Sequence, residues 1–230
     1  MHKVMYCLSR TALLALLLLG APLLGFAQAG VPPSQEWHID FQGDGNHNGT
    51  YGQTGPAAYS DPTVYWNIFE VAALRQPWPT LNTPSPSLRL RDANGEESQL
   101  ILSFQGDLYG WAGRGDFDPL LGDYLIFTLF DPFGAANNST WWIITGLVPN
   151  TRYCLTFYHP ITNPPYPRGL LFGLLGTDSA LVAVGGTEGE NVVSVCLVSS
   201  EDGTITGFVT VDARVGLEGD WAGLSIRRAE

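Results

Sequence analysis

The alternation of apolar and polar residues is the feature that most constrains how this chain can fold. Residues 37–41 read Trp-His-Ile-Asp-Phe, and residues 64–69 are mostly β-branched or aromatic. Because successive side chains of a β-strand point to opposite faces of the sheet, this pattern predicts strands with at least one buried face. Gly, Pro, Asn and Asp interrupt the pattern about every eight to fifteen residues, as turns between strands require.

Twelve segments carry this strand pattern, and no segment has a long helical period. They are residues 37–41, 64–69, 87–91, 98–104, 124–130, 140–145, 152–158, 169–175, 180–184, 192–198, 204–211 and 222–227. The Asn94-Gly95 pair between the third and fourth segments predicts a hairpin in which both residues can adopt positive φ. About ten to twelve strands predict an all-β fold, a two-sheet antiparallel β-sandwich of jelly-roll type.

Residues 1–29 have the three parts of a signal peptide. A basic start is followed by an apolar run over residues 11–26 and by Ala27-Gln28-Ala29, a small-x-small cleavage pattern. The run is short for the roughly 30 Å hydrocarbon core of a bilayer, which disfavours the alternative of an uncleaved membrane anchor. We expect cleavage after Ala29, and a secreted or periplasmic protein that forms one domain over residues 30–230 and has no membrane span.

The charge of the expected mature chain excludes several classes of partner. It contains all 22 acidic residues, nine arginines and no lysine, which gives a formal charge of −13. Binding to a phosphate backbone depends on cationic side chains that displace counterions. Nucleic acid and anionic lipid are therefore poor partners for this protein.

Cys154 and Cys196 are the two cysteines of the expected mature chain. A pair of cysteines in an exported domain is most simply a disulfide, and each of these lies in the middle of a predicted strand. The alternatives are a nucleophilic cysteine or a two-cysteine metal site. Two thiolates without suitably spaced histidines make a poor zinc site.

Several short strings resemble a diffuse family of secreted bacterial domains that have a galactose-binding-like jelly roll. The strings are Thr50-Tyr51-Gly52, Val64-Tyr65-Trp66-Asn67, Arg91-Asp92-Ala93-Asn94-Gly95, Leu120-Leu121-Gly122-Asp123-Tyr124, Gly146-Leu147-Val148-Pro149-Asn150-Thr151-Arg152-Tyr153 and Asp220-Trp221-Ala222-Gly223-Leu224. They are spread over most of the expected mature chain. The resemblance implies a fold more than an activity, because one fold hosts many functions.

Residues 44–49 read Asp-Gly-Asn-His-Asn-Gly and resemble the first half of a calcium loop. Oxygen donors stand at alternate positions, as Ca²⁺ ligation requires, but Gly55 occupies the place of the bidentate acid of an EF-hand. A calcium site of another kind would use Asp44, Asn46 and Asn48, completed by Asp61. The alternative is a turn built from residues that tolerate positive φ.

Tryptophans and carboxylates suggest a sugar-binding surface. An exposed indole offers a flat apolar face to a sugar ring, and nearby carboxylates bind hydroxyls. Trp141 and Trp142 are adjacent in a strand, so only one of them can enter the same core. The candidate ligand-binding residues are Trp78, Tyr109, Trp111, Asp116, Asp118 and Trp141. The alternative is that most aromatic rings fill the core, which we expect of Trp66 and Trp221.

The sequence shows no assembled catalytic group. His38, His47 and His159 are the histidines of the expected mature chain, and neither a Gly-x-Ser-x-Gly nor a His-Glu-x-x-His pattern occurs. Asp116 and Asp118 could mimic the carboxylate pair of a glycosidase, but chance proximity explains them better among 22 acids.

The sequence thus favours a secreted, non-catalytic module that binds extracellular or cell-surface glycan, with calcium as a candidate structural ion. One alternative is a structural protein of an envelope, matrix or appendage that self-associates. A second alternative is a secreted carbohydrate-active hydrolase whose acidic residues converge only in the folded chain.

Overall fold

The computed structural model describes residues 35–42, 64–71, 83–84, 86–105, 107–112, 120, 123–129, 138–160, 167–185 and 192–230. The predicted signal peptide and the candidate calcium residues Asp44, Asn46, Asn48 and Asp61 lie outside these ranges.

The described residues form sixteen strands and no helix. The strands are β1 (Glu36–Gln42), β2 (Trp66–Glu70), β3 (Thr83–Pro84), β4 (Ser87–Arg91), β5 (Glu97–Gln105), β6 (Asp107–Leu108), β7 (Gly110–Ala112), β8 (Asp123–Thr128), β9 (Ser139–Thr145), β10 (Arg152–Tyr158), β11 (Gly169–Leu175), β12 (Ser179–Gly185), β13 (Val192–Val198), β14 (Ile205–Val211), β15 (Glu218–Trp221) and β16 (Gly223–Arg228). All twelve predicted segments contain a strand.

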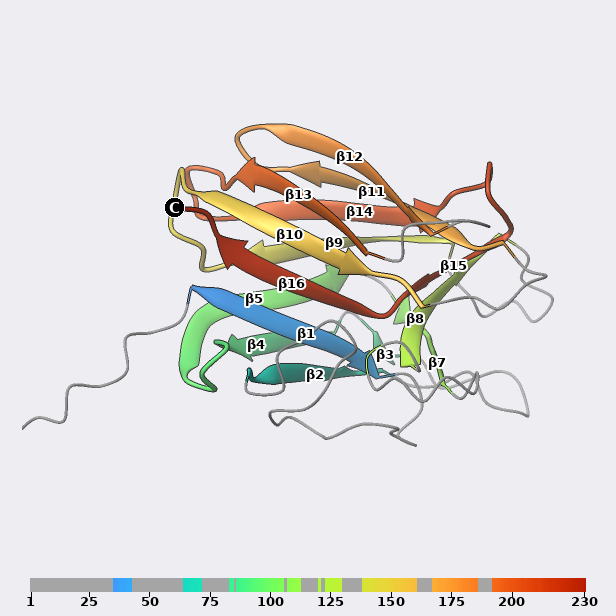
Figure 1. Ribbon diagram of the computed structural model, residues 1–230, viewed down its shortest axis with the longest axis horizontal. Coiled ribbons are helices and arrows are strands. Elements are labelled where there is room, and N and C mark those ends of the chain that lie inside the picture. The colour runs from blue at the N-terminus through green and yellow to red at the C-terminus, as the bar shows by residue number, and fades with distance from the viewer. Residues whose placement is uncertain are drawn as a thin grey trace, which may run out of the picture. The chain divides into compact units, whose positions relative to one another are not determined.

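Two large sheets contain most of these strands. One has the order β13-β10-β16-β1-β2 and the other the order β12-β11-β14-β9-β5-β4, with smaller sheets β15-β8-β7 and β3-β6. Figure 1 shows β1 (blue) beside β16 (dark red), so the first and last described strands are neighbours. The predicted all-β sandwich is confirmed, although β1 and β2 are parallel while the other named pairs are antiparallel.

The four strands that the sequence pattern did not predict are β3, β6, β7 and β15. Each has two to four residues, too few for a recognisable alternation. The predicted segment 222–227 begins where the chain changes sheets. Residues before Ala222 pair with β8, whereas Gly223–Arg228 pairs with β1 and β10.

Aromatic side chains from both large sheets meet in the core. The rings of Phe157 (β10) and Phe172 (β11) stack with their centroids 4.1 Å apart. The ring of Trp221, which is fully buried, lies 5.8 Å from that of Phe157 and 4.9 Å from that of Phe172. Trp142 of β9 completes this group, with its ring centroid 5.6 Å from that of Trp221. These contacts place the two large sheets face to face, as a sandwich requires.

The Asp92–Glu96 turn forms the predicted hairpin between β4 and β5 by a different mechanism from the one expected. Gly95 has a φ of 82°, but Asn94 is not among the described residues with positive φ. Instead, the Asp92 carboxylate accepts hydrogen bonds from the backbone N–H groups of Asn94 (2.9 Å) and Glu96 (3.0 Å). The side chain of Asp92 and the conformational freedom of Gly95 therefore set this turn.

The predicted disulfide is confirmed. Cys154 of β10 and Cys196 of β13 lie directly opposite each other in the antiparallel pair and are bonded across a sequence separation of 42 residues. The bond attaches β13, the edge strand of the five-stranded sheet, to β10. In the chain-entropy model a loop of this length stabilises the fold by roughly 4 kcal/mol.

Two glycines on neighbouring strands of the six-stranded sheet have opposite surroundings. Gly207 of β14 pairs with Trp142, and a Cβ atom placed on Gly207 would lie 2.0 Å from the Trp142 ring. Gly173 of β11 faces the other side of the sheet, where no atom of the described residues lies within 4 Å of such a Cβ atom. Gly207 is thus required by the core, whereas Gly173 leaves open space outside it.

We predict that Gly207→Ala and Gly173→Ala change the free energy of unfolding in different ways. The first should lose about 1–3 kcal/mol because the added methyl group overpacks the core against Trp142. The second should leave the free energy of unfolding within about 1 kcal/mol of the parent value. Alanine lowers the conformational entropy of the unfolded chain, and its methyl group meets no atom of the described residues. Urea unfolding of both variants measures this difference, and equal losses would contradict the assigned faces of the sheet.

Candidate functional site

Trp141 is exposed on the outer face of the six-stranded sheet. Its side chain is 52% exposed, whereas that of its neighbour Trp142 is 1% exposed and lies in the core. The predicted separation of the two rings onto opposite faces is therefore confirmed. Among the tryptophan side chains that the structure describes, Trp141 is the exposed one, while Trp66 and Trp221 are buried as expected.

A row of five residues crosses the strands at the level of Trp141. Strand register places them side by side in the order Gln105, Trp141, Phe208, Gly173 and Leu181, and we call this set the aromatic row. The rings of Trp141 and Phe208 contact each other, with centroids 4.8 Å apart and planes inclined by 50°. Leu181 at the far end is 75% exposed.

Charged side chains stand on one part of this outer face and not around Trp141: β4 presents Arg89 and Arg91, and β5 presents Glu97. The outward positions of β9, β14, β11 and β12 carry no Asp, Glu, Lys or Arg. Beside the row these positions hold hydroxyl groups, including those of Ser139, Thr206 and Thr210. The Thr210 hydroxyl donates to the backbone carbonyl of Asn138 at 3.1 Å and can still accept a hydrogen bond. In a strongly acidic chain this face is suited to a neutral ligand.

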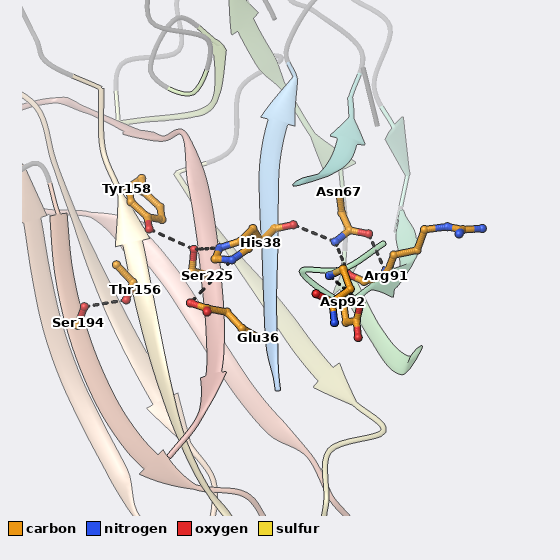
Figure 2. A network of polar contacts seen from close by, with 10 residues as sticks. Glu36, His38, Asn67, Arg91, Asp92, Thr156, Tyr158, Ser194 and Ser225 are labelled. Carbon is orange, nitrogen blue, oxygen red and sulfur yellow. Dashed lines mark hydrogen bonds and ion pairs between the residues drawn. The ribbon is translucent and has the colours of Figure 1, made fainter. Parts of the chain in front are cut away.

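The outer face of the five-stranded sheet carries a second row, which is polar. Ser194, Thr156, Ser225 and His38 lie side by side on β13, β10, β16 and β1, and we call them the polar row. The hydroxyls of Thr156 and Ser194 are 2.7 Å apart, as are the Ser225 hydroxyl and His38 Nδ1. Figure 2 shows Tyr158 pointing toward the same Ser225 hydroxyl, which is 3.1 Å from the Tyr158 hydroxyl.

The polar row is exposed at one end and buried at the other. Ser194 is exposed, whereas His38 is 7% exposed and its ring lies 4.9 Å from that of Trp66. Trp66 also contacts Tyr158, with ring centroids 6.0 Å apart. A small apolar cluster therefore covers the His38 end of the row.

The structure brings together a serine, a histidine and a glutamate that sequence reasoning did not connect. His38 Nδ1 is 2.7 Å from the Ser225 hydroxyl, and His38 Nε2 is 3.8 Å from Glu36 Oε1, as drawn in Figure 2. Because 3.8 Å is too long for a hydrogen bond, Glu36 does not orient the ring as the acid of a nucleophilic triad does. Ser225 is also only 5% exposed. This geometry suits a role in holding β1 to β16.

An asparagine ties the edges of the two large sheets together. The Asn67 Nδ2 group donates to the backbone carbonyls of His38 (2.9 Å) and Arg91 (2.8 Å), and Asn67 Oδ1 accepts the Arg91 N–H (2.7 Å). Arg91 belongs to β4 and Asn67 to β2, as Figure 2 shows. The buried amide thus replaces backbone pairing between these two strands.

A buried ion cluster links β15 to the start of β11. The Arg168 guanidinium contacts the carboxylates of Asp220 and Glu218, and it lies 3.5 Å from the Tyr124 hydroxyl. Burial alone would lower the pKa of Arg168, but the charges of Asp220, Tyr124 and Glu218 and the hydrogen bond to Asp220 outweigh it, so the pKa is raised. Arg168 therefore stays charged, and loss of either carboxylate partner would leave a buried cation.

Two buried histidines are neutral at neutral pH. Burial lowers the pKa of His38 from 6.5 to about 4. Burial also lowers the pKa of His159 to about 4, helped by the positive charge of Arg168 and opposed by a hydrogen bond with the Pro160 carbonyl. Both rings resist protonation because a charged imidazole would lose its hydration.

The structure describes some of the predicted ligand-binding residues and not others. Trp78, Asp116 and Asp118 lie outside the described residues, so the groove proposed for them stays a prediction. Tyr109 is half-buried against the apolar cluster that contains Trp66. Trp111 lies in β7 opposite Tyr124, and its side chain is outside what the structure describes.

Within the described ranges, no group of three or more His, Cys, Asp or Glu residues is arranged to hold a metal ion. None of the described segments is a helix that is long and apolar enough to span a membrane.

Comparison with known proteins yields only distant likenesses. No protein-family model and no curated protein matches the chain. TmCBM61, solved in complex with β-1,4-galactotriose, is 14% identical with a TM-score of 0.34, over 56% of this chain and 88% of that chain. CBM35 from Cellvibrio japonicus Abf62 is 20% identical with a TM-score of 0.29, over 44% of this chain and 76% of that chain.

A third similar structure is that of the CBM22-1–GH10 modules of Clostridium thermocellum xylanase 10B, complexed with xylohexaose. It is 13% identical with a TM-score of 0.32, over 56% of this chain and 26% of that chain. At these values the fold assignment rests on the strands of the protein itself.

Because His38 and His159 are buried and have lowered pKa values, we predict that the protein loses stability in mild acid. Their pKa values of about 4 in the folded chain lie below the unfolded value of 6.5, so the unfolded chain binds more protons between these pH values. Stability should therefore fall as the pH drops from 6.5 to 4, by up to about 3 kcal/mol per histidine.

His38→Gln and His159→Gln should each flatten the dependence of the unfolding free energy on pH in this window. Urea unfolding at a series of pH values measures the slope, which does not depend on the stability that a variant loses at pH 7. A slope identical to that of the parent in either variant would contradict the lowered pKa of the histidine that it replaces.

Proposed function

We propose that this protein is an exported, non-catalytic module that binds extracellular glycan on the outer face of its six-stranded sheet. The observation that carries the proposal is the exposure of Trp141 within a group of four neighbouring strands, β9, β14, β11 and β12, whose outward positions carry no charged side chain. The resemblance to secreted galactose-binding-like domains agrees with this assignment.

The aromatic row matches the chemistry of an uncharged sugar. The carbon-bound hydrogens on one face of a pyranose ring make that face apolar and slightly positive, and the face of an indole ring is apolar and slightly negative. Trp141 and Phe208 together present such a surface, and their mutual contact holds both rings in place. The amide of Gln105 and the hydroxyls beside the row supply donors and acceptors for sugar hydroxyls.

Three further parts of the proposal rest on the sequence. Export rests on the signal-peptide pattern of residues 1–29. Calcium binding rests on Asp44, Asn46, Asn48 and Asp61, whose oxygen atoms suit a hard cation. The non-catalytic role is supported by the poor geometry of the Ser225, His38 and Glu36 contact for nucleophilic attack.

Self-association is the second candidate function, and exposed leucines favour it. Leu181 is 75% exposed and Leu175 is 59% exposed, on neighbouring strands of the same face. Apolar groups that gather on a surface often mark a protein interface.

If self-association is the function, sedimentation of the mature chain should show a dimer or larger species that Leu181→Ser converts to a monomer. A monomer at all concentrations would exclude it.

Replacement of Trp141 tests the proposed glycan site. On a glycan array, with and without calcium, we expect the mature protein to bind at least one neutral glycan. Trp141→Ala should weaken that binding about tenfold or more, as calorimetry would measure, because the stacking surface is lost.

Leu217→Ala serves as the control. Leu217 is an exposed apolar residue that does not belong to the aromatic row, so its replacement should leave the affinity for glycan unchanged. Glycan binding of unchanged affinity in Trp141→Ala would place the site elsewhere.

A further inference from the structure

Gly173 leaves an open position within the aromatic row. Among the residues that the structure describes, none has an atom within 4 Å of a Cβ atom placed on Gly173. Phe208 lies beside Gly173 on one neighbouring strand and Leu181 on the other. Leu171 and Leu175 stand two residues before and after Gly173 on the same face of β11. Four apolar side chains therefore surround one residue that has no side chain, and we call this feature the Gly173 depression.

The Gly173 depression adjoins the stacking surface directly. Phe208 belongs to both, because its ring contacts Trp141 on one side and its strand pairs with Gly173 on the other. Adjacent strands are about 4.8 Å apart, so Gly173 lies one interstrand spacing from Phe208 and two from Trp141. A substituent on a sugar ring that rests on Trp141 and Phe208 can reach this distance.

The chemistry of the depression selects an apolar substituent. None of the five residues that form it carries a polar side chain, so a hydroxyl placed there would gain no hydrogen bond from them. A methyl group would instead exchange water for apolar contacts. The space suits a small group because a single missing side chain creates it.

Charge favours a neutral ligand over a second copy of this chain. The expected mature chain has a formal charge of −13, so two copies repel each other as they approach. The outward positions of β9, β14, β11 and β12 carry no cation, and of the two arginines that β4 presents on the same face, Arg89 and Arg91, the second is paired with Glu97. An uncharged glycan meets no such barrier.

We propose that the Gly173 depression receives a methyl group of an uncharged sugar, while the sugar ring stacks on Trp141 and Phe208. This inference rests on the proposed glycan-binding function and specifies its ligand class. Two kinds of sugar carry such a methyl group: N-acetylated sugars, at the end of the acetamido group, and 6-deoxy sugars, at carbon 6.

Two pairs of matched sugars test the proposal and distinguish these sources. Chitotriose and cellotriose differ in the acetamido group, and the methyl glycosides of L-fucose and L-galactose differ in the hydroxyl at carbon 6. We expect the methyl-bearing member of at least one pair to bind the mature chain about fourfold tighter or more, because one methyl group is transferred from water to an apolar site.

Filling the depression should remove this preference. Gly173→Val should bind both members of the pair with equal affinity, Gly173→Ala should show an intermediate preference, and Trp141→Ala should weaken binding of both members. Ser87→Val is the matched control, because it adds a valine to the edge strand β4 of the same sheet. Thermal unfolding confirms that each variant is folded, and Gly173→Ala carries the test if Gly173→Val is not.

The outcomes separate this inference from the function on which it rests. Equal affinity within both pairs, or a preference that survives in Gly173→Val and Gly173→Ala, would overturn the inference and leave glycan binding intact. Glycan binding that does not respond to Trp141→Ala would refute the proposed site and the inference with it. Loss of dimerisation in Gly173→Val, without any effect on sugar affinity, would overturn the inference in favour of self-association.

Discussion

Packing of aromatic rings between the two large sheets is the interaction on which the rest of the structure depends. Trp221 contacts rings from both sheets, including Phe157, Phe172 and Trp142. Large rings of this kind fix the distance between the layers and exclude water from it. Gly207 is part of the same arrangement, since its missing side chain makes room for the Trp142 ring. The packing between the inner faces tolerates few changes of side chain. The residues that we propose for ligand binding accordingly lie on an outer face.

The strand register that packs the inner faces also determines which side chains each sheet presents on its outer face. The two outer faces differ as a result. Because side chains alternate along each strand, the packing of Trp142 in the core places Trp141 outside. On the other sheet, burial of Ile39 and Leu224 aligns His38 with Ser225 on the outer face. One outer face therefore carries the aromatic row, while the other carries a hydrogen-bonded polar row. The alignment of residues within either row cannot change without a shift of the strands that build the core.

Local patterns were sufficient to predict the fold class, the twelve longer strands, the disulfide and the opposite orientations of Trp141 and Trp142. Side-chain hydrogen bonds between strands distant in sequence could not be predicted, since His38 and Ser225 meet across 187 residues. Gly173 and Gly207 are both glycines within apolar strands, and only the register shows that one faces the core and the other does not. The prediction of positive φ at both Asn94 and Gly95 was wrong for Asn94. There the Asp92 carboxylate accepts hydrogen bonds from the backbone N–H groups of the turn.

The place of β16 in its sheet has a consequence for the order of assembly. Gly223–Arg228 comes last among the described strands, yet it lies between β10 and β1 in the five-stranded sheet. During synthesis, neither neighbour can pair fully until this segment has left the ribosome. A nascent chain that ends before residue 223 lacks the middle of one layer, so it would stay incompletely folded until the last strand is made.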